Sequence, residues 1–227
     1  DLTFSYDGEN FILDSFNASF EGPALHVILG PNGVGKSTLL KLIAGALRPT
    51  RGFIRLDGRP LGRGEVAYIP QDNELLPWLT VLSNVELPLR IAGVNGAERR
   101  LRALEALRAM GVEVYASRYP KSLSGGERKR VALARALASN SRVILLDEPT
   151  ANLDPRARRT LWSHLRSLAR EKLVIVVTHD VGEAVVEGDF ISIMTGRPAR
   201  IAGVFRGGEK AWGELGRIVE AYYGAPP

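Results

Sequence analysis

The chain has 227 residues, of which 45% are hydrophobic and 24% are charged. These fractions are typical of globular proteins and exclude a disordered, collagen-like or low-complexity chain. The absence of cysteine excludes a disulfide scaffold and thiolate metal sites. The net charge of +5, with 24 Arg and 6 Lys against 25 acidic residues, is compatible with nucleotides, nucleic acid or lipid head groups, and selects none of these ligands.

Apolar periodicity and turn residues predict alternating strands and helices along the chain. No apolar run approaches the roughly 18 residues that a membrane-spanning helix needs. Apolar residues at helical spacing, as at Leu101, Leu104 and Leu107, predict a helix with one apolar face. Strands are predicted at 2–6, 11–20 and 24–29, within 53–69 around Asp57-Gly58, and at 143–146, 173–177 and 191–194; helices are predicted at 37–47, 97–110, 128–138 and 156–170.

This order of elements favours an α/β fold with a mainly parallel sheet. We expect a single domain over residues 1–227. Its core covers about 1–74 and 139–205, and a helical subdomain of about 75–138 is inserted into it. A short Gly-rich tail of about 206–227 follows and is predicted to be helical as far as Tyr223.

A glycine-rich turn follows the strand predicted at 24–29. It reads Gly30-Pro31-Asn32-Gly33-Val34-Gly35-Lys36-Ser37-Thr38 and fits the G-x-x-x-x-G-K-[ST] pattern, in the strand-to-helix context that confirms this pattern. Glycines let backbone N–H groups turn around phosphate oxygens, and the following helix N-terminus adds positive potential. Lys36 supplies a charge for the β- and γ-phosphates, and Ser37 supplies a hydroxyl for Mg²⁺. We therefore expect a nucleotide site here.

Two carboxylates follow the apolar strand predicted at 143–146. Open α/β sheets bind their ligands at the carboxyl ends of the strands, so both side chains are expected beside the nucleotide. Asp147 is predicted to be the acidic partner of the metal, through water. Glu148 is placed to orient or polarise the attacking water.

The segment Leu123-Ser124-Gly125-Gly126-Glu127 precedes another predicted helix. Locally it is a capping box, in which Ser124 caps the helix and Glu127 lies three residues further on. Gly125 and Gly126 also expose a helix N-terminus to an outside anion. Together with the glycine-rich turn, this segment closely resembles the signature of ATP-binding cassette (ABC) ATPases, which usually carry Gln at the position of Glu127.

Other residues match this family in chain order, over about residues 1–205. Tyr6 lies 24 residues before Gly30, where the family places an aromatic ring that stacks on adenine; a strand aromatic that faces the core is the alternative. Gln71, in Tyr68-Ile69-Pro70-Gln71, resembles the Q-loop glutamine that reaches the metal and the water.

The last two landmarks follow the carboxylates. Asp154, in Ala151-Asn152-Leu153-Asp154, resembles the D-loop and is also a good N-cap before Pro155. His179, in Thr178-His179-Asp180, resembles the switch histidine that contacts the γ-phosphate.

The resemblance implies a P-loop NTPase (RecA-like) core with a mainly parallel sheet, an antiparallel β subdomain and an inserted α-helical subdomain. It also implies a head-to-tail dimer, expected to be a homodimer, in which ATP lies between the P-loop of one subunit and Ser124-Gly125-Gly126 of the other. ATP and Mg²⁺ are the implied cofactors. The implied metal ligands are Ser37, Gln71 and Asp147; the implied catalytic residues are Glu148, His179 and Gln71.

The spacing of the motifs favours a transporter motor among ABC ATPases. Repair and chromosome ATPases insert long coiled coils, whereas here 87 residues lie between Lys36 and Ser124 with no sustained heptad. Translation factors carry two cassettes in one chain, and this chain has one. A motor without a spanning segment is expected to dock on separate permease subunits at the cytoplasmic face of the membrane.

The segment 74–85 is apolar and carries Trp78. It is interpreted as a docking groove for a coupling helix of the permease, with core packing of the helical subdomain as the alternative. Residues 76–81 resemble the motors of nitrate, sulfonate and taurine importers, and residues 84–89 resemble those of lipoprotein-release and macrolide-export systems. An importer of a small oxyanion or sulfonate is favoured, and an exporter is the alternative.

Two further function classes are weighed against the transporter motor. Arginine-rich stretches at 99–102, 128–130 and 156–159 are compatible with a nucleic-acid-associated ATPase, but Glu residues are interspersed nearby, so solvated helix faces explain them more simply. No nucleic-acid partner is expected. A switch GTPase would carry an Asn-Lys-x-Asp guanine motif, which the sequence lacks.

Overall fold

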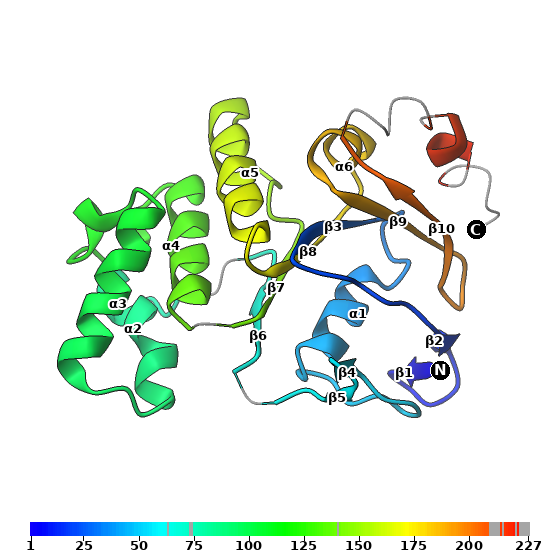
Figure 1. Cartoon of the computed structure of the whole chain (residues 1–227), viewed down its shortest axis with the longest axis horizontal. Coiled ribbons are helices and arrows are strands. Elements are labelled where there is room, and N and C mark those ends of the chain that lie inside the picture. Colours follow the sequence, from blue (N-terminus) through cyan, green and yellow to red (C-terminus); the bar gives the residue numbers. More distant parts are fainter. Residues whose placement is uncertain are drawn as a thin grey trace.

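A six-stranded sheet forms the centre of the molecule (Figure 1). The computed structural model describes residues 1–62, 64–72, 75–139, 141–208, 214, 216–220 and 222. The strand order is β10-β9-β3-β8-β7-β6, and every pairing is parallel except that of β10 with β9. The predicted mainly parallel sheet is therefore confirmed. Its strands are β3 (Ala24–Leu29), β6 (Val66–Ile69), β7 (Val143–Asp147), β8 (Leu173–Thr178), β9 (Phe190–Thr195) and β10 (Arg200–Arg206).

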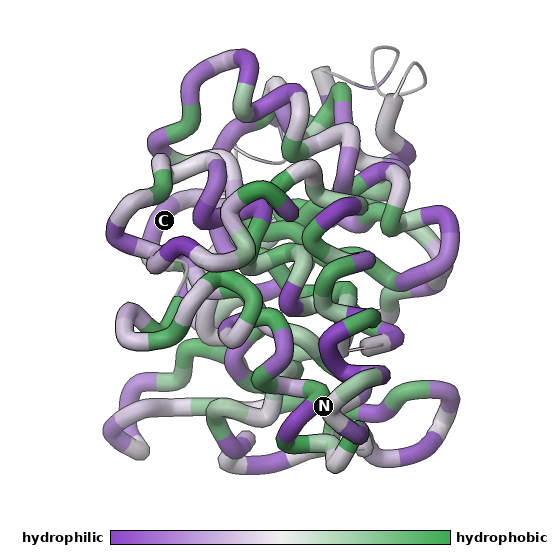
Figure 2. Tube along the Cα trace, turned by 90° about the vertical axis from the view of Figure 1, so that its left-hand side faces the viewer, coloured by the Kyte–Doolittle hydropathy of each residue, from purple (hydrophilic) through white to green (hydrophobic). Residues whose placement is uncertain are grey.

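The helices are α1 (Lys36–Ile43), α2 (Val81–Ile91), α3 (Gly96–Ala109), α4 (Gly125–Ala138), α5 (Pro155–Ala169) and α6 (Val181–Glu187). Of these, α1 covers one face of the sheet, and α4, α5 and α6 cover the other. Alternation along a strand sends neighbouring side chains to opposite faces. Val27 thus packs in the cluster that includes residues of α5 and α6, while Ile28 packs in the cluster that includes α1. Figure 2 shows the apolar segments gathered in the middle of the trace.

Two short antiparallel pairs lie beside α1 (Figure 1). One pairs β1 (Leu2–Ser5) with β2 (Phe11–Phe16), and the other pairs β4 (Arg55–Leu56) with β5 (Arg59–Pro60). The turn between β4 and β5 is Asp57-Gly58, and both residues have positive φ, of 51° and 76°. That conformation matches the twist of a two-residue hairpin and favours glycine in the second place.

Helices α2, α3 and α4 pack together at one end of the molecule (Figure 1). Each begins at a side-chain cap: Thr80, Asn95 and Ser124 accept from the backbone N–H three residues on. Two 3₁₀ turns, Glu113–Tyr115 and Pro120–Ser122, connect α3 to α4. These helices form the helical subdomain, whose proposed limits of 75–138 stay a prediction.

The predicted apolar face of the helix at 97–110, which is α3 in the structure, is wrong at Leu101, because this side chain is 58% exposed. The buried residues of α3 are Ala103, Ala106 and Leu107. Leu101 lies six residues, or about 120° around the helix, from Leu107. The inward face is therefore centred on small residues that let α3 approach its neighbours closely.

Helix α6 and strand β10 were not predicted from the sequence. Helix α6 has seven residues, one of which is Gly182, and β10 is an edge strand whose side chains are mostly exposed. Neither segment has the apolar run or the long periodicity by which an element is recognised. Of the predicted tail, residues 216–220 are helical, and Tyr223 lies outside the described residues.

Replacement of Leu107 and Leu101 tests this assignment of the α3 faces. Leu107→Ala empties a fully buried site and should lower the free energy of unfolding by about 2–5 kcal/mol. Leu101→Ala, the matched control, should change it by no more than about 0.5 kcal/mol. Urea unfolding of both variants measures the difference, and equal losses would contradict the packing.

Candidate functional site

The glycine-rich loop joins β3 to α1. A Cβ atom on Gly30 would lie 2.4 Å from the carbonyl oxygen of Met194, and one on Gly35 would lie 2.7 Å from Cγ2 of Ile12. Gly35 also has a φ of 109°, a conformation that side chains rarely allow. Glycine is therefore required at both ends of the loop, whose N–H groups, with those of the α1 N-terminus, form an anion cradle.

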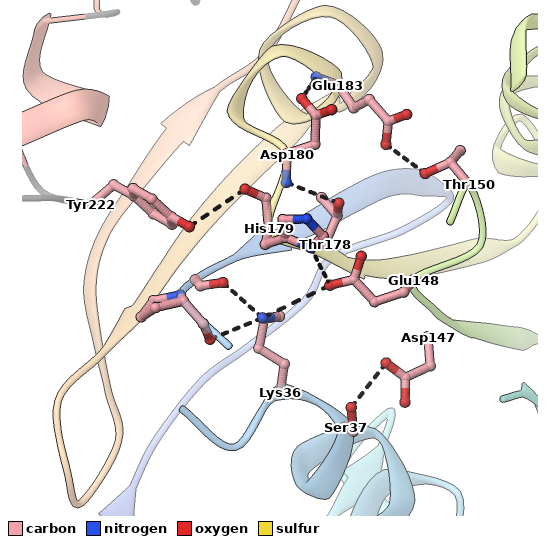
Figure 3. A network of polar contacts seen from close by, with 12 residues as sticks. Lys36, Ser37, Asp147, Glu148, Thr150, Thr178, His179, Asp180, Glu183 and Tyr222 are labelled. Carbon is pink, nitrogen blue, oxygen red and sulfur yellow. Dashed lines mark hydrogen bonds and ion pairs between the residues drawn. The ribbon is translucent and has the colours of Figure 1, made fainter. Parts of the chain in front are cut away.

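Lys36 begins α1 and points back into this loop (Figure 3). Its Nζ donates to the carbonyl oxygens of Gly30 at 2.7 Å and Pro31 at 3.1 Å, and lies 4.0 Å from Oε1 of Glu148. Burial lowers the pKa of Lys36, and the charges of Glu148 and Asp147 oppose that shift. The loop carbonyls thus hold a poorly hydrated ammonium beside the cradle, where it can pair with a phosphate.

The two carboxylates at the end of β7 face different partners (Figure 3). Asp147 accepts from Ser37 Oγ at 2.9 Å through Oδ1 and from the Tyr68 hydroxyl at 3.1 Å through Oδ2. Glu148 Oε1 lies 3.1 Å from Nδ1 of His179, which follows β8. Asp147 is thereby joined to α1, and Glu148 is joined to the histidine.

A cleft of about 520 Å³ brings most of the predicted nucleotide residues together. Predicted residues that line it are Tyr6, Asn32, Gly33, Gly35, Lys36, Ser37, Thr38, Gln71, Glu148 and His179. Gly30, Pro31 and Val34 belong to the adjoining loop, and Asp147 lies behind Ser37. Ile12 and Ala151 also line the cleft. Neither was predicted to belong to the site, because apolar side chains carry no chemical signal.

Tyr6 stands at the rim of this cleft. It is 62% exposed, its hydroxyl lies 3.2 Å from Thr38 Oγ1, and its ring packs edge-on against Phe4 at 4.8 Å. The alternative interpretation, a strand aromatic facing the core, is therefore wrong. An exposed ring fixed at one edge offers a face for stacking.

The signature residues line a separate cleft of about 320 Å³, together with Asp154. Ser124 and Glu127 form the predicted capping box: the Ser124 N–H donates to Glu127 at 2.7 Å, and the Glu127 N–H donates to Ser124 at 3.3 Å. Asp154 caps α5, as predicted. A Cβ on Gly125 would meet nothing within 4 Å, so the start of α4 is open to a ligand. Within the part of one chain that the structure describes, the signature and the P-loop line different clefts.

The oxygen ligands available beside the P-loop suit Mg²⁺. Ser37, Asp147 and Gln71 offer a hydroxyl, a carboxylate and an amide oxygen near one another. No group of three His, Cys, Asp or Glu side chains in the described part of the chain could hold a metal by itself. Mg²⁺ is commonly bound by one or two protein oxygens together with substrate phosphates. The ligand set therefore fits an ion that arrives with a nucleotide.

A buried polar network missed by the sequence analysis lies behind His179 (Figure 3). Thr150 Oγ1 donates to Glu183 Oε2 at 2.7 Å, and Arg158 Nε lies 3.2 Å from Glu183 Oε1 as an ion pair. The Glu183 N–H donates to Asp180, the cap of α6. The network ties the loop after Glu148 to the helix after His179. Thr150 lies just after Asp147 and Glu148 in the sequence. This position is the one sequence feature that could have identified Thr150 as part of the site.

The apolar segment at 74–85 is divided between core and surface. Leu75, Val81, Leu82 and Val85 are buried, whereas Trp78 is 70% exposed. Asn84 is fully buried, and its side chain bonds to the backbone of Leu76, Leu79 and Thr80. These bonds hold the turn that presents Trp78. Glu74 lies outside the described residues.

Thr150→Val should destabilise the protein in a pH-dependent way. At pH values above the pKa of Glu183 the ionised carboxylate loses a donor, which costs about 1–3 kcal/mol of unfolding free energy. Burial raises the pKa of Glu183 above the ordinary 4.5, and Thr150 opposes that shift. The cost should therefore shrink as the pH falls through the raised pKa and the carboxylate takes up a proton.

Urea unfolding at neutral and acidic pH checks this expectation. Thr160→Val is the matched control, because the Thr160 hydroxyl bonds to the Arg156 carbonyl on an exposed helix face. It should change the unfolding free energy by no more than about 0.5 kcal/mol. A Thr150→Val cost that is independent of pH would contradict the role given to Glu183.

Comparison with known proteins identifies the family. Residues 13–151 match the family model described as "ABC transporter". The taurine import ATP-binding protein TauB of Pseudomonas aeruginosa is 44% identical over 179 residues, covering 77% of this chain and 68% of that protein. The glycine betaine/proline betaine transport protein ProV of Escherichia coli is 40% identical over 189 residues, covering 78% of this chain and 47% of that protein.

Solved structures agree with this result. A dimeric structure of MJ0796, described as a bacterial ABC transporter cassette, superposes with a TM-score of 0.78 at 34% identity and covers 90% of this chain and 96% of that chain. The structure of cbiO1 from Clostridium perfringens is described as part of the ABC transporter complex cbiONQ. It superposes with a TM-score of 0.82 at 27% identity, and the match covers 98% of this chain and 93% of that chain. The chain therefore belongs to the ABC transporter family, as one of its ATP-binding subunits that hydrolyse ATP to drive transport.

Proposed function

We propose that this subunit powers an importer and works as a head-to-tail homodimer with two ATP molecules at the interface. The observation that carries the proposal is the division of the site between two clefts. One holds Lys36, Glu148 and His179, and the other holds Ser124 and Asp154. Neither cleft contains both the P-loop and the signature residues. A second copy, turned head to tail, would supply the missing half. The dimeric assembly of MJ0796 supports this arrangement.

In the P-loop cleft, each residue has a task set by its position. The amides of the loop from Gly30 to Gly35 and the Lys36 ammonium hold the phosphates, and the exposed Tyr6 ring stacks on adenine. Glu148 orients the attacking water. His179, bonded to Glu148, is placed to contact the γ-phosphate. Positioning and charge stabilisation of this kind supply most of the rate enhancement in phosphoryl transfer.

The proposed metal ligands are Ser37, Gln71 and Asp147, which are joined or adjacent at the floor of the cleft. A Mg²⁺ ion held by these residues would supply positive charge to the phosphate oxygens. The Tyr68 hydroxyl donates to Oδ2 of Asp147. This bond fixes the carboxylate so that its Oδ1 faces Ser37. On the other cleft, Ser124, Gly125 and Gly126 complete the γ-phosphate shell of the partner's nucleotide, with Asp154 at the same interface.

Trp78 marks the proposed docking surface for a permease. It is a large apolar side chain exposed on a turn that Asn84 holds rigid, and such residues commonly anchor interfaces. The described residues contain no helix that is long and apolar enough to span a membrane. We place the subunit at the cytoplasmic face of the membrane, bound to separate transmembrane subunits, because the chain matches the ABC transporter family. The membership of cbiO1 in a transporter complex supports this placement.

The relatives favour import of a small organic solute. Those with an assigned cargo are named for taurine import or for glycine betaine and proline betaine transport, which supports a sulfonate or a similarly small zwitterion as the cargo. No relative among these supports the lipoprotein-release or macrolide-export alternative. The arginine stretches do not favour nucleic acid, because Arg102 and Arg158 pair with Glu98 and Glu183.

Replacing the carboxylate at position 148 tests the proposed function. Glu148→Gln keeps the shape of the side chain but cannot accept a proton from water, so turnover should fall by about 10²- to 10⁴-fold. ATP should then accumulate in the cleft and hold the dimer. Light scattering should show an ATP-induced doubling of mass in the variant. In the wild type the dimer should disperse as ATP is consumed once Mg²⁺ is supplied.

Glu171→Gln, at an exposed carboxylate, is the matched control and should behave as the wild type. Hydrolysis by Glu148→Gln at the wild-type rate would remove Glu148 from its role. A variant that binds ATP and stays monomeric would contradict the homodimer.

A further inference from the structure

Lys129 is a buried cation that the proposed mechanism does not use. It lies in the first turns of α4 and is 5% exposed; among the described residues, the other buried lysine is Lys36 of the P-loop. A buried ammonium is costly unless it is paired. Lys129 Nζ donates to the backbone carbonyl of Glu148 at 3.1 Å. It thus contacts the main chain of the carboxylate that orients the water.

The backbone of Glu148 needs such a restraint. Its φ is 45°, in the left-handed region, which a residue other than glycine adopts only with backbone strain. Its N–H donates to Val177 of β8 at 3.0 Å, and its carbonyl accepts from the Ala151 N–H at 3.2 Å as well as from Lys129. Strained conformations persist where the surroundings determine them fully. Here the left-handed turn is what directs the side chain to His179 and Lys36.

Burial disfavours the charge of Lys129 and lowers its pKa to about 8. The neighbouring acidic groups Glu148, Asp72, Asp147 and Glu183 oppose that shift and favour the charged form. The residue also lies one helical turn from Gly126, at the start of α4 that the partner's nucleotide would contact. The Glu148 carbonyl is therefore fastened to the helix that begins at the other cleft.

We propose that Lys129 is a positioning residue for ATP hydrolysis, which holds the Glu148 carbonyl and thereby keeps the Glu148 carboxylate aimed at the attacking water. This inference rests on the proposed role of Glu148. It assigns Lys129 no contact with ATP. Loss of the donor should therefore lower kcat and leave ATP affinity nearly unchanged.

The test compares variants that differ in the donor at position 129. Lys129→Met keeps the length and the apolar stem but has no N–H, and its kcat should fall about ten- to a hundredfold, since small misplacements of a catalytic group cost this much. KM and the Kd for ATP should change less than about threefold. Lys129→Gln keeps an uncharged N–H donor and should recover most of the kcat.

Lys172→Met is the matched control. Lys172 also donates to a backbone carbonyl, that of Ser141 at 2.7 Å, but lies at the opposite ends of the strands. Its loss should lower Tm and leave kcat per folded molecule unchanged. Lys129→Leu is a second donor-free variant, for use if Lys129→Met does not fold.

Two results would overturn the inference. One is a wild-type kcat in a folded donor-free variant. The other is an equal loss of kcat in Lys129→Gln and Lys129→Met that is proportional to the loss of folded protein. That result would mean that Lys129 has a purely structural role. A wild-type protein that does not hydrolyse ATP, or an active Glu148→Gln, would instead contradict the proposed function itself.

Discussion

Parallel pairing of β3, β7 and β8 is the constraint on which the site depends. Parallel strands end at the same edge of a sheet, so the chain leaves β3 at Gly30, β7 at Asp147 and β8 at Thr178 within one small region. The P-loop, the carboxylates and the histidine are therefore neighbours although they are far apart in sequence. Because the three strands are buried on both faces, their ends are held rigidly, as electrostatic catalysis requires.

In the proposed dimer, the edge of one sheet supplies only half of each ATP site. The signature helix starts in a different cleft from the P-loop, and in the proposed dimer its open amides act on the partner's nucleotide. In that dimer, closure of the two clefts would depend on bound ATP, and opening of the dimer would depend on hydrolysis. That dependence would convert phosphoryl transfer into relative motion of the two subunits, which the Trp78 turn could pass to a permease. The Thr150–Glu183 network joins the loop after Glu148 to α6, and Lys129 joins Glu148 to α4.

Local chemistry made much of this predictable from sequence. The Ser124 and Asp154 caps were predicted because both partners of each bond lie within three residues, and the P-loop was predicted because its glycines serve local backbone geometry. Features that depend on packing were missed or wrong. The inward face of α3 excludes Leu101 because α2 and α4 decide which side is covered. Tyr68 contacts Asp147, which lies 79 positions along the chain, and Lys129 contacts Glu148, which lies 19 positions along the chain. Contacts over such distances leave no pattern in the sequence.

The central claim, that each site is built from two chains, is tested most directly by mixing two inactive variants. Lys36→Ala removes the phosphate-binding lysine, and Ser124→Arg blocks the signature cleft; neither pure variant should hydrolyse ATP. A heterodimer of the two contains one site with both halves intact. Random pairing in an equal mixture should therefore restore about a quarter of the wild-type rate. A mixture that stays inactive, or hydrolysis by either folded variant alone, would contradict the account.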